Sequence, residues 1–290
     1  MIGSKLIEFV ESESRNALKE HGGIRMYDRP LVGFAAADDP WFDRFKEPGI
    51  IGPEFRRPGE WLEGARSVVS YFLPFTQAVR DSNRHSGMPS EGWLSSRIEG
   101  ESFNDFVRTF LIGLIRGMGG DAVAPTFDPR YMKYPPSKIP LPARFAGAAL
   151  WPGQFMNAGM TSNWSERHVA FAAGLGTFGL HRALISEKGC AGRYGSVVTT
   201  LILTPSRRKY KHPNEYCPYL TNGGCGACIE RCPSGAITRE GKNKEICNTY
   251  IETRIHALYV TRWGCAKCNL SVPCEGGIPK MVAKDVEAEM

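Results

Sequence analysis

The sequence has neither a long hydrophobic run nor a secretion signal. None of its apolar segments approaches the 18 residues that a membrane-spanning helix requires. Residues 1–20 carry charges throughout and lack the apolar core and small-residue cleavage site of a signal peptide. We therefore expect a cytoplasmic protein with no membrane partner, whose cysteines stay reduced instead of forming disulfides.

Cysteine is abundant, and it is concentrated near the C-terminal end. Eight of the nine cysteines lie between residues 217 and 274, namely Cys217, Cys225, Cys228, Cys232, Cys247, Cys265, Cys268 and Cys274. The run Cys225-x2-Cys228-x3-Cys232-Pro matches the end of the bacterial ferredoxin motif, in which the cysteine before proline ligates a second cluster. Eight thiolates are the number that two 4Fe-4S clusters need, so we predict two such clusters.

The same crossing rule divides the eight cysteines into two groups. The first cluster is expected on Cys217, Cys225, Cys228 and Cys274. The second is expected on Cys232, Cys247, Cys265 and Cys268. Asn222 stands where the usual run has a cysteine, so Cys217 has to substitute for it.

Zinc is the main alternative for these cysteines. Two Cys-x2-Cys pairs could form one zinc site, but four cysteines and the Cys-Pro step would then have no explanation. Cys190, the ninth cysteine, is predicted to be a free thiol in a loop, because nothing nearby repeats a ligand spacing.

The formal net charge of +6 is weak evidence for nucleic acid, since two oxidised clusters with their thiolates would remove about four positive charges.

The chain divides near the basic stretch "SRRKYKH" at 206–212, which is either a solvated linker or a docking point for an electron donor. We predict one domain over 1–205 and a second over 206–290. Helices are expected over 4–21, between Ser102 and Gly119, and over "WSERHVAFAAG". Strands are expected over 65–75 and 196–204, and a functional loop over 128–142.

The stretch "GLGTFG" at 174–179 matches the dinucleotide fingerprint letter for letter. That fingerprint is meaningful only between a strand and a helix, and here a helical pattern precedes it. We therefore reject NAD binding and expect only that the backbone turns tightly or closely approaches another body there.

Residues 165–204, "SERHVAFAAGLGTFGLHRALISEKGCAGRYGSVVTTLILT", resemble the corrin-binding segment of the epoxyqueuosine reductases. "ARSVVSYFLPF" resembles an early strand of that family, and the cysteine series with "CNTYIET" resembles its ferredoxin domain. The wider superfamily includes the reductive dehalogenases. The resemblance implies an α+β (α/β) fold, in which a nitroreductase-like cobalamin-binding domain is followed by a ferredoxin-like domain with two 4Fe-4S clusters.

The resemblance also implies site residues. Gly174, Leu175, Gly176, Gly179 and His181 would bind the cofactor. The catalytic candidates are Tyr131, Tyr134, Glu166 and Arg167, with Arg130, Lys133 and His168 beside them. None of the six histidines has an aspartate two residues before it and a glycine three after it, so cobalamin bound without a histidine ligand is expected.

Two departures from the family affect the expected substrate. Met160 and Thr161 stand where the reductases have a proton-donating aspartate, and 16 residues follow Cys274 where those enzymes continue into a region that holds tRNA. We therefore predict a cobalamin-dependent iron–sulfur reductase of a small molecule, supplied by a ferredoxin- or flavodoxin-type donor and not acting on tRNA. The alternatives are an electron-transfer or corrinoid-activating protein without substrate chemistry of its own, or a flavin reductase that binds FMN.

Overall fold

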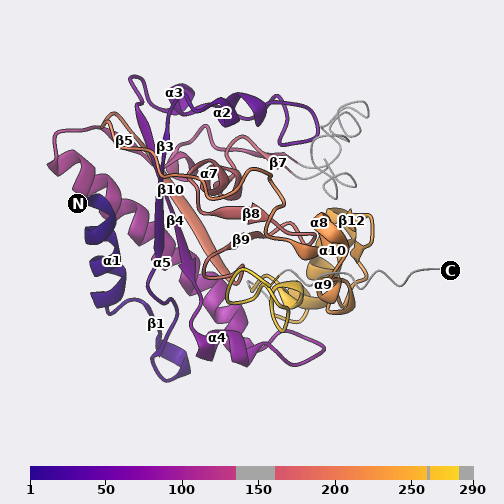
Figure 1. The fold of residues 1–290 in the computed structure, drawn as a ribbon. Coiled ribbons are helices and arrows are strands. Elements are labelled where there is room, and N and C mark those ends of the chain that lie inside the picture. Colours follow the sequence, from indigo (N-terminus) through magenta and orange to yellow (C-terminus); the bar gives the residue numbers. More distant parts are fainter. Residues whose placement is uncertain (135–160, 260–261, 281–290) are drawn as a thin grey trace.

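A four-stranded antiparallel sheet forms the centre of the protein in the computed structural model, which describes residues 1–134, 161–259 and 262–280 (Figure 1). The strand order is β3-β4-β10-β5. The strands span β3 Leu31–Ala36, β4 Ser67–Pro74, β10 Gly192–Thr199 and β5 Ala122–Val123. β4 has every residue buried, which is the pattern of a strand covered on both faces.

Side chains of β4 alternate between two hydrophobic cores. Val69, Tyr71 and Leu73 face a core that includes α1 (Ile2–Ser12) and α5 (Glu91–Gly117). Val68 and Phe72 face a second core, which contains α2 (Pro40–Arg44) and α7 (Glu166–Ala172). The alternation follows from the two-residue period of a strand, and Figure 1 shows α1 and α5 on one side of the sheet with α7 on the other.

Short elements complete the fold. Before the fingerprint-like stretch lie β1 Ala17–Leu18, η1 Lys19–His21, β2 Ile24–Arg25, α3 Pro58–Trp61, α4 Gln77–Ser82, η2 Pro125–Phe127, β6 Lys133–Tyr134 and β7 Thr161–Ser162. After it lie β8 Gly176–Phe178, β9 Leu184–Ser186, α8 Pro218–Asn222, α9 Ala227–Glu230, β11 Ile237–Thr238, β12 Gly241–Lys242, α10 Lys244–Tyr250, the π-helix η4 Ile251–His256 and η5 Lys267–Asn269. The described residues contain no helix that is long and apolar enough to cross a membrane.

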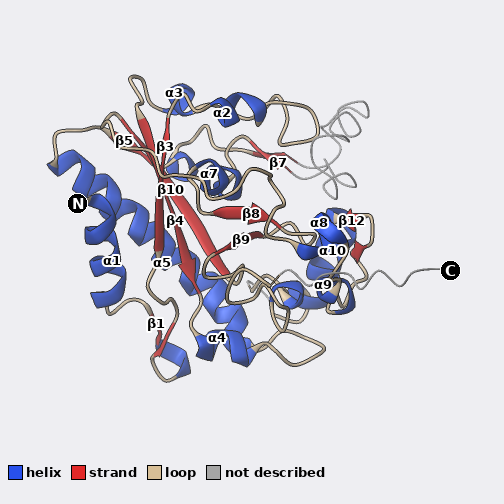
Figure 2. Cartoon of the chain, in the orientation of Figure 1, coloured by secondary structure: helices blue, strands red, loops and turns tan. Residues whose placement is uncertain are grey.

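The cysteine-rich part of the chain consists of short helices and loops, as Figure 2 shows around α8, α9 and α10. It packs directly against the sheet-containing part. Lys267 donates from Nζ to the carbonyl oxygens of Asn83 at 3.1 Å and His85 at 2.7 Å. Arg84 forms an ion pair with the buried Glu275 at 2.7 Å. The predicted boundary between residues 205 and 206 stays a prediction.

The stretch 206–212 is mostly exposed, but several of its residues contact the first part of the chain. Tyr210 is buried in the second core, and its hydroxyl donates to the carbonyl oxygen of Phe171. Arg208 pairs with Asp39, and Lys209 pairs with Glu187 at 2.6 Å. The ion pairs of Arg208 and Lys209 therefore anchor the segment to the first part of the chain.

Three of the expected elements form with altered ends. The helix predicted over 4–21 ends at Ser12, because the buried Asn16 side chain bonds to the backbone of Val10 and Tyr27 and stabilises a turn instead. The helix expected after Ser102 begins earlier, with Ser90 accepting from the Trp93 N–H as its N-cap. The strand predicted over 196–204 lies at Gly192–Thr199.

Candidate functional site

A cavity among the described residues has a volume of about 700 Å³, which is in the range of small-molecule and cofactor sites. Its wall comes from the loop 49–51, from β7 and the first turn of α7, from the turn between β8 and β9, and from β12 and α10. The cavity therefore lies where the sheet-containing part meets the cysteine-rich part.

Positive charge dominates the cavity wall. It carries Lys133, Arg167, Arg182, Lys242 and Lys244, and none of the described lining residues is an aspartate or glutamate. Desolvation by the surrounding protein lowers the pKa of Arg182 to about 10 and, with the neighbouring cations, that of Lys244 to about 7. Burial also lowers the pKa of His168, on the same wall, to about 3. The cavity is suited to an anionic ligand.

The clustered cysteines interact electrostatically with one another. Burial raises the pKa of Cys228, and the charge of Cys268 raises it further, followed by those of Cys274, Cys217 and Cys225. The Cys268 thiol, raised chiefly by burial, interacts with Cys247 and Cys232, and Cys265 interacts with Cys268 and Cys247. Cys268 therefore interacts with members of both predicted groups, and the division into two clusters stays a prediction.

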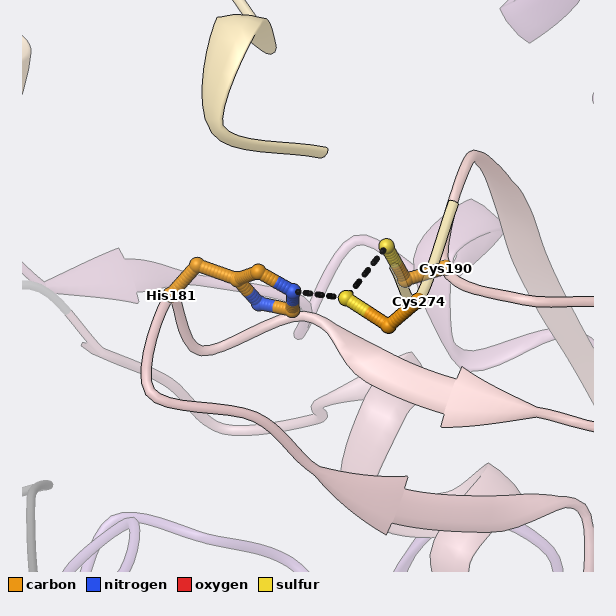
Figure 3. A group of neighbouring side chains, drawn as sticks. All are labelled: His181, Cys190 and Cys274. Carbon is orange, nitrogen blue, oxygen red and sulfur yellow. Dashed lines mark hydrogen bonds between the residues drawn. The ribbon is translucent and has the colours of Figure 1, made fainter. Parts of the chain in front are cut away.

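Cys190 lies beside Cys274, as Figure 3 shows. The two sulfur atoms are 3.8 Å apart, and Nε2 of His181 lies 3.2 Å from the Cys274 sulfur. The hydrogen bond from Cys190 lowers the pKa of Cys274, and the neighbouring His181 lowers it further. The hydrogen bond to Cys274 raises the pKa of Cys190, as does burial. The arrangement therefore favours a thiolate on Cys274 that accepts hydrogen bonds from a Cys190 thiol and the His181 imidazole.

Sequence reasoning missed this role for Cys190. The predicted free thiol is a buried side chain packed among the other cysteines. Its contact with Cys274 spans 84 residues, and no spacing motif reaches that far. His181, which was predicted to bind the cofactor, lines the cavity and joins its wall to Cys274.

The predicted cofactor-binding glycines are explained by contacts within the chain. A Cβ on Gly176 would lie 2.0 Å from the carbonyl oxygen of Ile185, on the paired strand β9. Gly174 has φ +82, a conformation that favours glycine, and a Cβ on Gly179 would lie 2.7 Å from the His181 ring. Leu175 is buried in the second core. The expected tight turn and close approach are confirmed, but these four residues are not among those that line the cavity.

The predicted catalytic residues fall in different places. Arg167 lines the cavity, whereas Glu166 turns away from it and accepts from the Ser196 hydroxyl at 2.5 Å. Tyr131 packs against the second core. Tyr134 belongs to β6, and its side chain lies outside the described residues, as do residues 135–142 of the predicted loop.

The neighbours of these candidates also have definite positions. Arg130 pairs with Asp128 at 2.7 Å. Lys133, His168 and Thr161 line the cavity. Thr161 also donates to the Ile51 carbonyl oxygen at 3.1 Å, and Met160 lies outside the described residues.

Burial raises the pKa of Glu166 to about 7, although the charge of Arg108 opposes the rise. Arg108 lies 3.4 Å from this carboxylate and also pairs with Glu101 at 3.0 Å and Asp105 at 2.5 Å. The Trp164 indole donates to the same Ser196 hydroxyl at 3.0 Å. Glu166 therefore belongs to a buried polar network that joins α5, α7 and β10.

The chain is similar in sequence or structure to several known proteins. An epoxyqueuosine reductase of Listeria monocytogenes is 28% identical over 127 residues, which cover 40% of this chain and 31% of that protein. A solved catabolic reductive dehalogenase in complex with 3-bromo-4-hydroxybenzoic acid has a similar structure, with a TM-score of 0.51 and 13% sequence identity. The match covers 96% of this chain and 36% of the dehalogenase chain. A solved epoxyqueuosine reductase from Streptococcus thermophilus matches 87% of this chain and 64% of its own, at a TM-score of 0.49 and 16% identity.

No family profile matches the sequence. The chain spans about a third of the length of the curated relative that it matches and less than two thirds of the solved Streptococcus thermophilus enzyme. The dehalogenase match supports the predicted mixed helix and strand fold, and the relatives are oxidoreductases.

Proposed function

We propose, from its similarity to an epoxyqueuosine reductase and a reductive dehalogenase, that the chain is an iron–sulfur reductase that acts on a small molecule at a bound cobalamin. A nitroreductase-like domain over 1–205 would hold the cofactor, and a ferredoxin-like domain over 206–290 would hold two 4Fe-4S clusters. Electrons would come from a ferredoxin- or flavodoxin-type donor. The observation that carries the proposal is a cationic cavity bordered by the cysteine-rich segment.

The arrangement of the eight thiols fits clusters better than zinc. A zinc ion bonded to sulfur at about 2.3 Å would hold its ligand sulfurs about 4 Å apart. Within the described part of the chain, no three of the eight cluster cysteines bring their sulfurs within 4.8 Å of one another; the group that does so is His181, Cys190 and Cys274. A 4Fe-4S core is larger than a single zinc ion, so its ligand sulfurs lie farther apart than those of a zinc site.

Two contacts link the proposed clusters to the cavity. Cys247 of the second group lies on the cavity wall itself. Cys274 of the first group bonds to His181, which also lies on that wall. Either route would bring electrons from a thiolate-held cluster to a cofactor in the cavity without crossing the core of the sheet.

The cavity has groups that fit a phosphate-bearing cofactor. The basic side chains of the wall are suited to negative oxygens, and Phe178 and Ile251 give the wall apolar surface. Cobalamin, when bound without a protein ligand to cobalt, supplies low-potential electron-transfer and reductive chemistry. Of the predicted catalytic groups with described side chains, we retain Arg167 as a group that contacts the substrate or cofactor.

Cofactor analysis of protein purified without oxygen tests the proposal. We expect eight irons per chain and one corrinoid released on denaturation, identified by mass. Release of FMN with no corrinoid would favour the flavin reductase, and iron–sulfur protein with no further cofactor would favour an electron-transfer protein. Zinc in excess of iron would overturn the cluster assignment.

Cys190 and Cys274 offer a matched pair of variants, because their sulfurs lie 3.8 Å apart. Cys274→Ser is expected to lose the first cluster and about half of the iron. Cys190→Ser is expected to keep all of it, since we assign Cys190 as a hydrogen-bond donor and not as a ligand. If the Cys190 variant loses a cluster and the Cys274 variant keeps its iron, then Cys190 is the ligand and Cys274 is the hydrogen-bonding neighbour.

A further inference from the structure

Three cations from three separate elements face the same cavity. Arg167 lies in the first turn of α7, Arg182 in the turn between β8 and β9, and Lys244 at the first position of α10. Arg167 is exposed and lines the cavity, and desolvation lowers the pKa of its guanidinium. The fold therefore brings three positive side chains together that are up to 77 residues apart in the sequence.

These cations influence one another. After burial, the charges of Arg182, Arg167 and Lys242 are the causes that lower the pKa of Lys244. Burial lowers the pKa of His168 most, and the charges of Lys244, Arg167 and Arg182 lower it further. A negative ligand group placed at this wall would interact favourably with all three cations.

The backbone of Arg182 gives a second, independent observation. Its φ is 65°, in the left-handed region where residues with a Cβ are disfavoured and glycine is preferred. The turn is held by the Arg182 N–H, which bonds to the Gly179 carbonyl at 2.8 Å, and by the Ala183 N–H, which bonds to His181 Nδ1 at 3.0 Å. Strained residues of this kind concentrate at ligand-binding sites, and here the strain places a guanidinium on the cavity wall.

Lys242 has a different environment. Its Nζ lies 3.9 Å from the Cys268 sulfur. Burial opposes a charged lysine there, but the thiolates of Cys268 and Cys247 raise its pKa overall. We assign Lys242 to the second cysteine group and exclude it from the ligand-binding cations.

We infer that Arg167, Arg182 and Lys244 form an anion subsite that holds a carboxylate or phosphate group of the substrate. The inference rests on the proposed reductase function and adds a substrate class to it, namely an organic anion. The phosphate of a bound cofactor has the same chemistry, so the experiment has to separate the two sources.

Inorganic pyrophosphate is a suitable probe for this subsite. Its binding would be measured by calorimetry at low ionic strength on cluster-containing protein, once loaded with corrinoid and once produced without it. We expect binding in both forms, weakened by added salt as charge screening requires. Binding that disappears on corrinoid loading would assign the cations to the cofactor and overturn the substrate assignment, and absence of binding in both forms would overturn it as well.

Arg182→Gly separates binding from folding. The change removes the charge and also the backbone strain, so we expect pyrophosphate to bind about ten-fold or more weakly while the variant melts no lower than the parent protein. Lys244→Gln should weaken binding in the same direction. Arg116→Gln, a change of an exposed arginine outside the cavity, is the matched control and should bind normally.

Unchanged binding in both the Arg182 and Lys244 variants, in well-folded protein with full iron content, would refute the subsite. Failure of the proposed function would give a different observation, namely no corrinoid in the mass analysis. Pyrophosphate binding to the cluster-containing protein could still be measured in that case, so the two failures are distinguishable.

Discussion

Replacing Gly176 by alanine tests whether the glycine-rich stretch contacts a cofactor or another strand. In the folded chain, the new Cβ would lie 2.0 Å from the carbonyl oxygen of Ile185 and 2.8 Å from its carbonyl carbon. These are backbone atoms of β9, so no side-chain rotation relieves the clash. Gly176 pairs with Ser186 in that ladder, and the two strands have to separate locally to admit a methyl group.

The expected cost follows from overpacking. Insertion of a methyl group into a closely packed site costs about 1–3 kcal/mol of unfolding free energy, and a clash with backbone places this change at about 3 kcal/mol. For a chain of this size, the melting temperature should fall by about 5 °C. Because the clash is with β9, corrinoid and iron should fall only in proportion to the folded fraction.

Gly113→Ala is the matched control. Gly113 lies in α5, and its Cβ would meet nothing within 4 Å. This change should raise stability by about 0.5–1 kcal/mol, because alanine loses less backbone entropy than glycine in a helix. A Gly176→Ala variant that melts like the parent protein but lacks corrinoid would refute our reasoning and would place the cofactor against this glycine.

The remaining predictions concern the buried acid and the cysteine groups. Burial raises the Glu166 pKa from 4.5 to about 7, so the folded state binds a proton that the unfolded state has lost, and unfolding free energy should fall by at most about 3 kcal/mol as pH rises through this window. Glu166→Gln should flatten that fall, and an unchanged dependence of the urea midpoint between pH 5 and pH 8 would contradict the assignment. Cys232→Ser should remove the second cluster although Cys232 adjoins Cys228 in sequence, and loss of the signal of the first cluster in electron paramagnetic resonance would disprove the crossing. His181→Phe should make the potential of the first cluster more negative, because the donor to Cys274 is lost; an unchanged potential in redox titration would show that the contact does not tune it.

Local patterns were enough to predict several elements. The β-branched and aromatic run at 65–75 became β4, and "ERHVAFA" became α7, because both patterns repeat with the period of the element that they form. The division of the eight cysteines into two cluster groups is also predicted from their spacing, since the cysteines of a Cys-x2-Cys pair reach the same cluster and the cysteine before proline reaches another. That division stays a prediction.

The tertiary structure alone decided which residues meet around the cavity. The prediction from "GLGTFG" that these glycines approach another body was correct, but the body that Gly176 meets within the chain is β9. That identity depends on the pairing of two strands, which sequence spacing does not encode. Likewise, a cysteine that seemed isolated at 190 contacts Cys274.

The cation subsite is the clearest case of a feature absent from any local pattern. Arg167, Arg182 and Lys244 belong to no common motif, and each one by itself is an ordinary charged residue of a helix or turn. The sequence determines their charges, but their repulsion and desolvation exist only after α7, the β8–β9 turn and α10 close around one cavity. Burial and Coulomb interaction depend on distance in space and not on separation along the chain.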